Sequence, residues 1–168
     1  MSWPFIQAVN YTPANRTSVD WIVIHSMEVQ KRSGVAKNVA AWFAGDSAPK
    51  ASAHYCVDNE QIYQCVKETD IAWHAPGANQ KGIGVELAGQ ASDTWDDQYA
   101  NDVISNGIKL VSDLADRWNI PKVVVLDLDL AKGVRGITTH AEVSKAFKLG
   151  NHWDPGPNFP LQDFVARL

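Results

Sequence analysis

Two short runs of almost wholly apolar residues most constrain how this chain can fold. They are segments 20–25 (DWIVIH) and 82–88 (GIGVELA). Both are too short for a typical helix, and the first is rich in β-branched residues, so both predict buried strands. Segments with helical spacing alternate with these strands. The alternation indicates an α/β fold with a mixed central β-sheet flanked by helices.

Three segments have the features of helices. The first opens at Ser33-Gly34, can end at Gly45, and places four residues on one face: Val35, Val39, Trp42 and Phe43. The longest has Thr94 as its N-cap and is ended by Pro121. Its apolar residues follow helical spacing at Tyr99, Val103, Ile104, Ile108, Val111, Leu114, Ala115 and Trp118. A terminal helix is expected from Pro160 through Leu168.

The remaining strands are expected to be shorter. Segments 53–58 and 61–66 lie close enough to form a hairpin around Asn59-Glu60. Segment 122–126 could form an edge strand, and segment 136–140 a last short strand. Cys56 and Cys65 could face each other across the hairpin. A disulfide is possible there, but two reduced, packed thiols are expected in a protein made in the cytoplasm.

Length and charge exclude several classes of protein. A chain of 168 residues fits one domain over 1–168, with a core of about 18–160, and we expect a monomer. The net charge of −4 and the lack of a long basic run argue against nucleic acid as a partner. No apolar run approaches the ~20 residues of a membrane helix, so no membrane insertion is expected. The N-terminal MSWPFIQAVNYTP lacks the basic region and apolar core of a secretory signal.

Two histidines and one aspartate are candidate metal ligands. His25 ends the first apolar strand, and His140 ends the GITTH strand. Ligands gather beyond the carboxyl ends of strands in such sheets, so these two side chains could converge. Asp154 lies in HWDPGP, which the prolines and the glycine make rigid. Two imidazoles and one carboxylate form the usual catalytic zinc site, although a hydrogen-bonded structural role is the alternative for each histidine.

Glu86 is a further candidate for a catalytic residue. An ionisable carboxylate in a strand of Ile, Val and Leu must be paired, metal-linked or raised in pKa. Glu86 is therefore a candidate general base, with a structural salt bridge as the alternative. Trp73 and His74, within AWHAPGAN, could line a ligand cleft, although a tryptophan in a loop also packs without function.

Five blocks of sequence, taken in order, carry a resemblance to a known family. They are WIVIHSME, NVAAWFAGDSAPKASAHYCVDNEQIYQCV, DIAWHAPGANQKGIGVELAG, TTHAEVS and HWDPGPNFP. The chain resembles the zinc-dependent N-acetylmuramoyl-L-alanine amidases, a family that includes the peptidoglycan recognition proteins. The likeness runs from about Trp21 to Pro160 and implies the fold of that family. Within the family, the chain is most similar to the amidase domains of bacteriophage endolysins.

The resemblance implies roles for particular residues. The implied ligands of zinc (Zn²⁺) are His25, His140 and Asp154, and Glu86 matches the family's catalytic glutamate. The residues that match the lining of the muropeptide groove are Trp73, His74 and Asn79. His54 matches a histidine that is not usually a ligand. The chain departs from the family at Ala53, where some members carry a catalytic tyrosine, and at His152, where many carry lysine.

The implied reaction is hydrolysis of the amide bond between N-acetylmuramic acid and L-alanine in bacterial peptidoglycan. Zinc would polarise the carbonyl and activate water, Glu86 would transfer the proton, and His152 would donate to the developing oxyanion. The expected setting is a phage endolysin, made in the host cytoplasm and acting on the cell wall. The alternatives are a cytosolic amidase that recycles muropeptides and a non-catalytic peptidoglycan-binding module. The latter would be expected to lack a ligand or the base.

Overall fold

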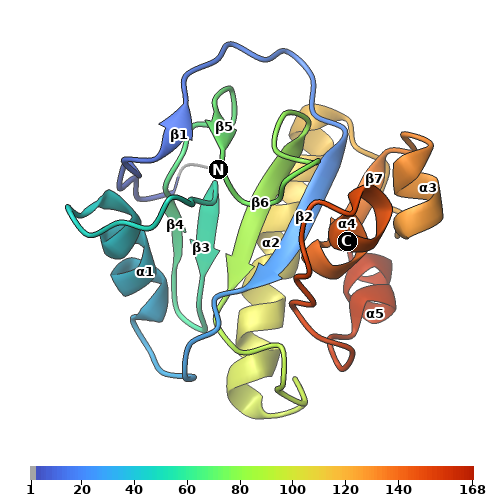
Figure 1. Cartoon of the computed structure of the whole chain (residues 1–168). Coiled ribbons are helices and arrows are strands. Elements are labelled where there is room, and N and C mark those ends of the chain that lie inside the picture. Colours follow the sequence, from blue (N-terminus) through green and yellow to red (C-terminus); the bar gives the residue numbers. More distant parts are fainter. Residues whose placement is uncertain (1–2) are drawn as a thin grey trace.

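A five-stranded sheet in the order β4-β3-β6-β2-β7 forms the centre of the computed structural model (Figure 1). Its strands are β2 (Trp21–Ser26), β3 (Tyr55–Val57), β4 (Ile62–Gln64), β6 (Gly82–Leu87) and β7 (Gly136–Thr139). Strand β4 is antiparallel to β3, and the other neighbouring pairs are parallel, which confirms the predicted mixed sheet. The structure describes residues 3–168, so the first two residues of the expected domain lie outside the described part.

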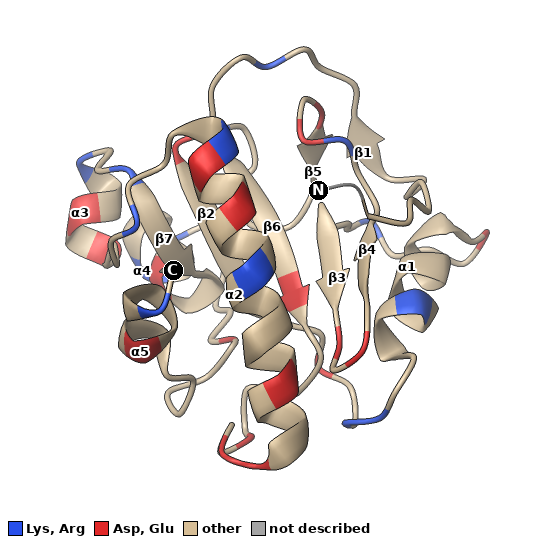
Figure 2. Cartoon of the chain, turned by 180° about the vertical axis from the view of Figure 1, so that it is seen from behind, with Lys and Arg blue, Asp and Glu red and all other residues tan. Residues whose placement is uncertain are grey.

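Helices flank this sheet. They are α1 (Val35–Ala44), α2 (Gln98–Trp118), α3 (Asp127–Ala131), α4 (His140–Phe147) and α5 (Leu161–Ala166). Figure 2 shows α2 lying across the back of the sheet, whereas α1 contacts β3 and β4, and α4 contacts β7 and β2. A separate two-stranded sheet, which was not predicted, joins β1 (Tyr11–Thr12) to β5 (Ile71–Ala72). Within residues 3–168, no helix has the length and apolarity needed to cross a membrane.

One face of the sheet packs against α2, and the opposite face carries candidate site residues. Successive side chains of a strand point to opposite faces. The members of β2 and β6 that pack against α2 in the main core are Ile22, Ile24, Ile83, Val85 and Leu87. The alternate residues, His25 in β2 and Gly84 and Glu86 in β6, therefore face away from α2. Because His25 is the register partner of Glu86, the first two strands predicted from sequence carry two candidate site residues side by side.

Two expected details of the helices are wrong. The N-cap of α2 is Asp97, whose carboxylate accepts a hydrogen bond from the Ala100 amide at 2.8 Å, whereas the Thr94 hydroxyl donates to Asp96. The expected face of Val35, Val39, Trp42 and Phe43 is not the buried face of α1, since Trp42 is 50% exposed. The buried face is formed instead by Val35, Ala36, Ala40 and Phe43. Ala36, Ala40 and Phe43 share a core cluster with Cys56 and Tyr63 of the hairpin.

The region before α4 also differs from expectation. Segment 122–126 forms a single bridge, Val124 to Ile137, rather than an edge strand, because α3 begins immediately after it with Leu126 as N-cap. His140 is not the last residue of a strand but the first residue of α4. Thr139 caps α4 by accepting a hydrogen bond from the Glu142 amide at 3.3 Å. The sequence Thr-His-Ala-Glu is thus a helix start that the strand prediction overlooked.

The predicted hairpin is present, with β3 and β4 paired in antiparallel register. Cys56 in β3 is directly beside Glu86 of β6 in the register of the sheet. The Sγ atoms of Cys56 and Cys65 lie 3.7 Å apart as free, buried thiols. The expected facing of the two cysteines is therefore observed.

His54 is a fully buried imidazole next to β3. Its Nδ1 accepts a hydrogen bond from the Gly84 amide at 3.0 Å, and its Nε2 lies 3.2 Å from the Asp70 carbonyl oxygen. Burial, followed by the charge of Arg16, lowers the pKa of His54 to about 3. The ring is therefore neutral and structural, as expected from the sequence.

We predict that His54→Ala destabilises the protein by about 1–3 kcal/mol at neutral pH, because the buried Gly84 amide loses its acceptor. Between about pH 6.5 and about pH 3, His54 is protonated in the unfolded chain but stays neutral in the folded protein. The wild-type protein therefore loses stability as the pH falls through this range. The deficit of the variant should therefore shrink by about 1.4 kcal/mol between about pH 7.5 and about pH 5.5. Urea unfolding of both metal-free proteins at the two pH values measures this difference in the free energy of unfolding. An unchanged deficit would contradict the neutral buried ring.

Candidate active site

Three buried side chains from distant parts of the chain meet at one edge of the sheet. His25 lies near the end of β2, His140 directly follows β7, and Asp154 lies in the loop after α4. The Asp154 carboxylate lies between the two rings, with Oδ2 3.1 Å from His25 Nδ1 and Oδ1 3.1 Å from His140 Nδ1. One ligand atom from each residue lies within 4.8 Å of the others, so the three could hold a metal ion.

Parallel pairing and a fixed loop explain this convergence. Because β2 and β7 are parallel neighbours, their carboxyl ends bring His25 and His140 together. The backbone carbonyl of Asp154 accepts a hydrogen bond from the Ala141 amide at 3.0 Å, which ties the loop to the start of α4. Gly156 has a φ of +91°, and a Cβ there would lie 1.8 Å from the Ala91 carbonyl oxygen. A glycine is therefore required for the loop to pack so closely.

The electrostatics suit a cationic ligand. Burial alone would raise the pKa of Asp154, but its hydrogen bonds with His140 and His25 hold that pKa well below its ordinary value. Burial lowers the pKa of His25, so its ring is neutral and offers a lone pair. An ionised carboxylate and neutral imidazoles are the states that bind metal. Two nitrogen donors and one oxygen donor fit zinc with a coordination position left open.

Glu86 lies beside this cluster, in register with His25. Its Oε2 is buried and has no hydrogen-bond partner in the described part of the chain, and no cation among residues 3–168 pairs with it. Burial, followed by the charges of Asp154 and Glu28, raises the pKa of Glu86 well above its ordinary value. The salt bridge considered as the alternative is thus not observed. A carboxyl group with a raised pKa at a cleft wall is suited to proton transfer.

His152 lies over the cluster without joining it. Its ring stacks on that of His140, with centroids 4.0 Å apart and planes 14° apart. Its Nδ1 lies 3.8 Å from Asp154 Oδ1, and its side chain is 55% exposed. Burial, followed by the charge of His140, lowers the pKa of His152. A neutral imidazole at the mouth of the cleft still offers one N–H to a ligand.

The three residues expected to line the groove have different surroundings. Trp73 is 37% exposed, and its Nε1 donates to the Thr12 hydroxyl at 2.9 Å. His74 is buried, with its Nδ1 3.1 Å from His25 Nε2. Asn79 lies behind His74, where its Oδ1 accepts hydrogen bonds from the His74 and Ala75 amides at 2.9 and 2.7 Å. Trp73 and His74 border the cleft, and Asn79 does not.

These side chains surround an open cleft of about 200 Å³. The residues that sequence reasoning missed in its lining are Ser26, Glu28, Phe43, Ala51 and Ser52. Glu28 accepts hydrogen bonds from the Ser26 hydroxyl at 2.5 Å and the Ala91 amide at 2.8 Å. The only signal for Glu28 was its place three residues after His25 in the first sequence block.

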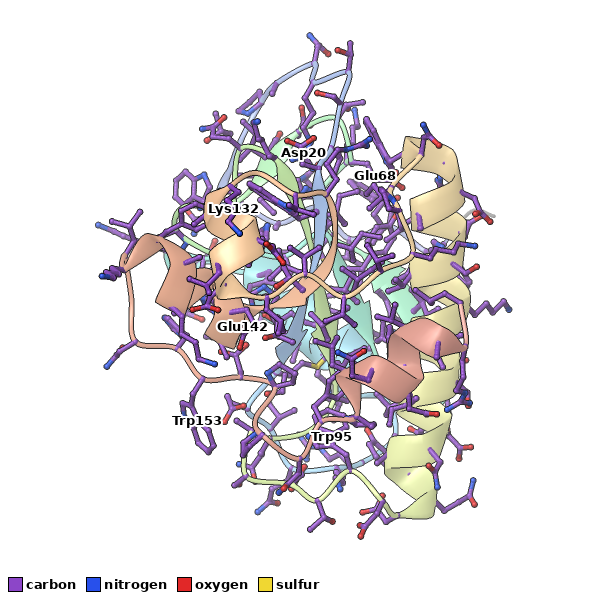
Figure 3. All side chains as sticks on the ribbon, turned by 90° about the vertical axis from the view of Figure 1, so that its right-hand side faces the viewer. Asp20, Glu68, Trp95, Lys132, Glu142 and Trp153 are labelled. Carbon is purple, nitrogen blue, oxygen red and sulfur yellow. The ribbon has the colours of Figure 1, made fainter. Side chains whose placement is uncertain are left out.

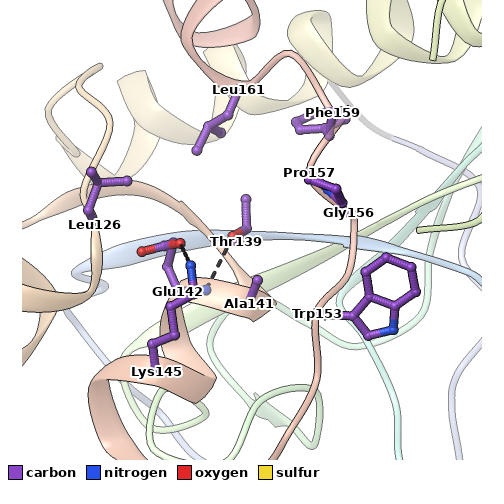
Figure 4. A pocket seen from close by; sticks show the side chains of 10 residues that line it. All are labelled: Leu126, Thr139, Ala141, Glu142, Lys145, Trp153, Gly156, Pro157, Phe159 and Leu161. Atoms are coloured by element: carbon purple, nitrogen blue, oxygen red, sulfur yellow. Dashed lines mark hydrogen bonds and ion pairs between the residues drawn. The ribbon is translucent and has the colours of Figure 1, made fainter. Parts of the chain in front are cut away.

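A larger cavity of about 390 Å³ adjoins the loop after α4, which carries Asp154 (Figure 4). Trp153 and Pro157 of the loop border it, and Trp153 projects outward (Figures 3 and 4). Its walls are mostly apolar, and its charged residues, Glu142 and Lys145, pair with each other at 2.6 Å. None of the three possible metal ligands lines this cavity, so the smaller cleft is the candidate active site.

Comparison with known proteins identifies relatives of this chain. Residues 15–157, which include every candidate site residue, match the model of the family described as N-acetylmuramoyl-L-alanine amidase. N-acetylmuramoyl-L-alanine amidase A of Achromobacter lyticus is 29% identical over 173 residues, which span 96% of this chain and 89% of the relative. The fold resembles that of Staphylococcus aureus hydrolase AmiA in complex with its ligand, with a TM-score of 0.73, 18% identity, and coverage of 99% of this chain and 84% of that chain. It also resembles a mutant endolysin from Bacillus subtilis, with a TM-score of 0.62, 22% identity and coverage of 99% of both chains.

We predict that alanine at His25, His140 or Asp154 weakens zinc binding by at least about 100-fold, since each change removes one ligand of a buried cluster. His152→Ala serves as the control, because His152 is close to the cluster but not part of it. Zinc content after dialysis, measured by elemental analysis, distinguishes the variants. A full zinc complement in any of the three variants would remove that residue from the site.

Proposed function

Since this chain belongs to the N-acetylmuramoyl-L-alanine amidase family and is a peptidoglycan hydrolase of that kind, we propose that it is a zinc-dependent endolysin that lyses bacterial cells. The bond cut is the amide between N-acetylmuramic acid and L-alanine. The observation that carries the proposal is the convergence of His25, His140 and Asp154 beside Glu86, an acid with an unpartnered buried oxygen.

In this proposal His25, His140 and Asp154 hold the zinc ion. The fit rests on the donor set, because two imidazole nitrogens and a carboxylate oxygen converge within 4.8 Å in a buried position. Bound zinc supplies Lewis-acid activation of the scissile carbonyl and of water, which an amide needs because it is a poor electrophile. The Asp154 carboxylate also supplies the negative charge that a divalent cation requires in a buried site.

Glu86 moves the proton. Its carboxylate accepts a proton from the attacking water and returns it to the nitrogen of the departing L-alanine. The carbon–nitrogen bond breaks, leaving a carboxyl group on the lactyl arm of the sugar and a free amine on the peptide. A carboxyl group with an ordinary pKa would release its proton too readily to act as the acid of the second step. The burial that raises the pKa of Glu86 therefore suits both steps.

His152 stabilises the carbonyl oxygen as negative charge develops on it. Its ring is held flat against His140 while its edge remains exposed to the cleft. The ring N–H can donate a hydrogen bond to the oxygen without carrying a full charge. Trp73 offers an exposed aromatic surface at the same cleft, which suits the sugar or the peptide of the muropeptide.

Two experiments test the function and its setting. Mass spectrometry of digested peptidoglycan should find free stem peptides with L-alanine at the N-terminus beside intact glycan strands. Shortened glycan strands would contradict cleavage of the proposed amide bond. Turbidity of intact cell walls tests the endolysin role, which the similarity to a solved endolysin supports. Clearing of intact walls is expected, whereas cleavage of soluble muropeptides alone would favour a recycling amidase.

We predict that Glu86→Gln lowers turnover by about 100-fold or more with zinc retained, because the amide keeps the shape but cannot accept the proton. Stem-peptide release and zinc content are measured on the same preparation. Near-normal turnover in this variant would assign proton transfer to another group.

We predict that His152→Ala lowers turnover by about 10- to 1000-fold with zinc retained, as expected for the loss of one oxyanion donor. His152→Lys should keep substantial activity, because an ammonium group also donates hydrogen bonds. Rates at saturating substrate separate this effect from binding. Wild-type turnover in the alanine variant would leave His152 as a packing residue of the loop.

A further inference from the structure

His74 touches the candidate metal ligand His25 on the side opposite Asp154. His25 Nδ1 lies 3.1 Å from Asp154 Oδ2, and His25 Nε2 lies 3.1 Å from His74 Nδ1. The two rings meet edge to face, with centroids 5.2 Å apart and planes 86° apart. Both nitrogens of His25 are therefore engaged by buried partners, one of them a carboxylate and the other an imidazole.

The sheet is shaped to hold the His74 ring. A Cβ on Gly84 would lie 2.5 Å from His74 Cγ, and one on Gly82 would lie 3.3 Å from His74 Cε1. The ring fits against β6 because both positions on this face of the strand carry glycine. Asn79 fixes the backbone of His74 through the 2.9 Å hydrogen bond to its amide. The pattern Gly-x-Gly-x-Glu thus leaves space for one imidazole and places Glu86 next to it.

We propose that His74 is a positioning residue of the metal centre, accepting a hydrogen bond at Nδ1 from the Nε2–H of His25. The inference rests on His25 being a metal ligand, as in the proposed function. A histidine that binds metal through one nitrogen carries its proton on the other and donates it to a neighbouring acceptor. When His25 Nδ1 binds the metal, the proton of the neutral ring lies on Nε2, and His74 is the acceptor that fixes this tautomer and the orientation of His25.

This role differs from contact with the muropeptide. If His74 accepts a hydrogen bond at Nδ1, its neutral ring has a lone pair on Nδ1 and carries its proton on Nε2. Nε2 is buried and has no hydrogen-bond partner in the described part of the chain.

Two substitutions separate the positioning role from substrate contact. His74→Phe keeps a ring in the space above Gly84 but removes the acceptor, whereas His74→Asn places a carbonyl oxygen near the position of Nδ1. Zinc affinity is measured by competition with a chromogenic chelator, without substrate. We expect His74→Phe to weaken zinc binding by about 10- to 100-fold, as for loss of the partner of a metal-binding histidine, and His74→Asn to recover most of it.

Two results would overturn the proposal. Unchanged zinc affinity in both variants with a raised KM would assign His74 to the substrate. Complete loss of zinc in both would make His74 a ligand. The His25→Ala variant distinguishes the failure of this inference from the failure of the proposed function. If His25→Ala loses zinc and His74→Phe does not, the metal site stands and the positioning role falls.

Gly84→Ala provides a second test that leaves His74 chemically intact. The added Cβ must displace the ring, so zinc affinity is expected to fall although residue 84 has no ligand atom. Ser52→Ala is the matched control. Ser52 Oγ accepts a hydrogen bond from the Trp73 amide at 3.0 Å, so its removal loosens the segment that carries His74 without changing a contact of His25. Urea unfolding verifies that each variant folds. Equal zinc affinity in Gly84→Ala and Ser52→Ala would contradict the inference.

Discussion

The Asp154 carboxylate is buried between the rings of His25 and His140, and a buried charge is tolerated only where such partners surround it. This requirement links three parts of the fold. The parallel pairing of β2 with β7 brings the two rings to one edge, and the close packing of Gly156 on Ala91 holds the loop that carries the carboxylate. The site thus depends on the sheet, the start of α4 and the loop after α4 together.

The alternation of β6 divides its residues between stability and chemistry. Ile83, Val85 and Leu87 pack in the core against α2, and the residues between them face the cleft. On that second face, glycine at positions 82 and 84 accommodates His74, and Glu86 contributes the carboxylate. A larger residue at position 84 would improve burial in an ordinary strand but would meet the imidazole here. The packing of the His74 ring therefore accounts for glycines in a central strand, where they otherwise weaken the strand.

The sequence predicted the parts of the fold that depend on local pattern. The apolar runs predicted β2 and β6, and the carboxyl ends of strands indicated that His25 and His140 could meet. Asp154 was a candidate because it lies in the rigid HWDPGP loop, but no spacing rule connects a loop residue to β2 across 129 positions. Its place between the two rings follows only from the fold. The contact of His74 with His25 depends on the absence of a side chain at Gly84, which no periodicity reveals. Helix α4 was missed because the apolar GITT run favoured a longer strand.

Two carboxyl groups of one cleft differ in pKa because they differ in partners. Asp154 is held ionised by two imidazoles, and Glu86, with one buried oxygen unpartnered, has a raised pKa to which the charge of Asp154 itself contributes. Neighbouring acids whose environments separate their pKa values take separate roles. Asp154 is suited to hold a cation, and Glu86 is suited to exchange a proton. The apolar strand marks Glu86 in the sequence but leaves pairing, metal binding and a raised pKa open, so the division follows from the neighbours of the two acids in space.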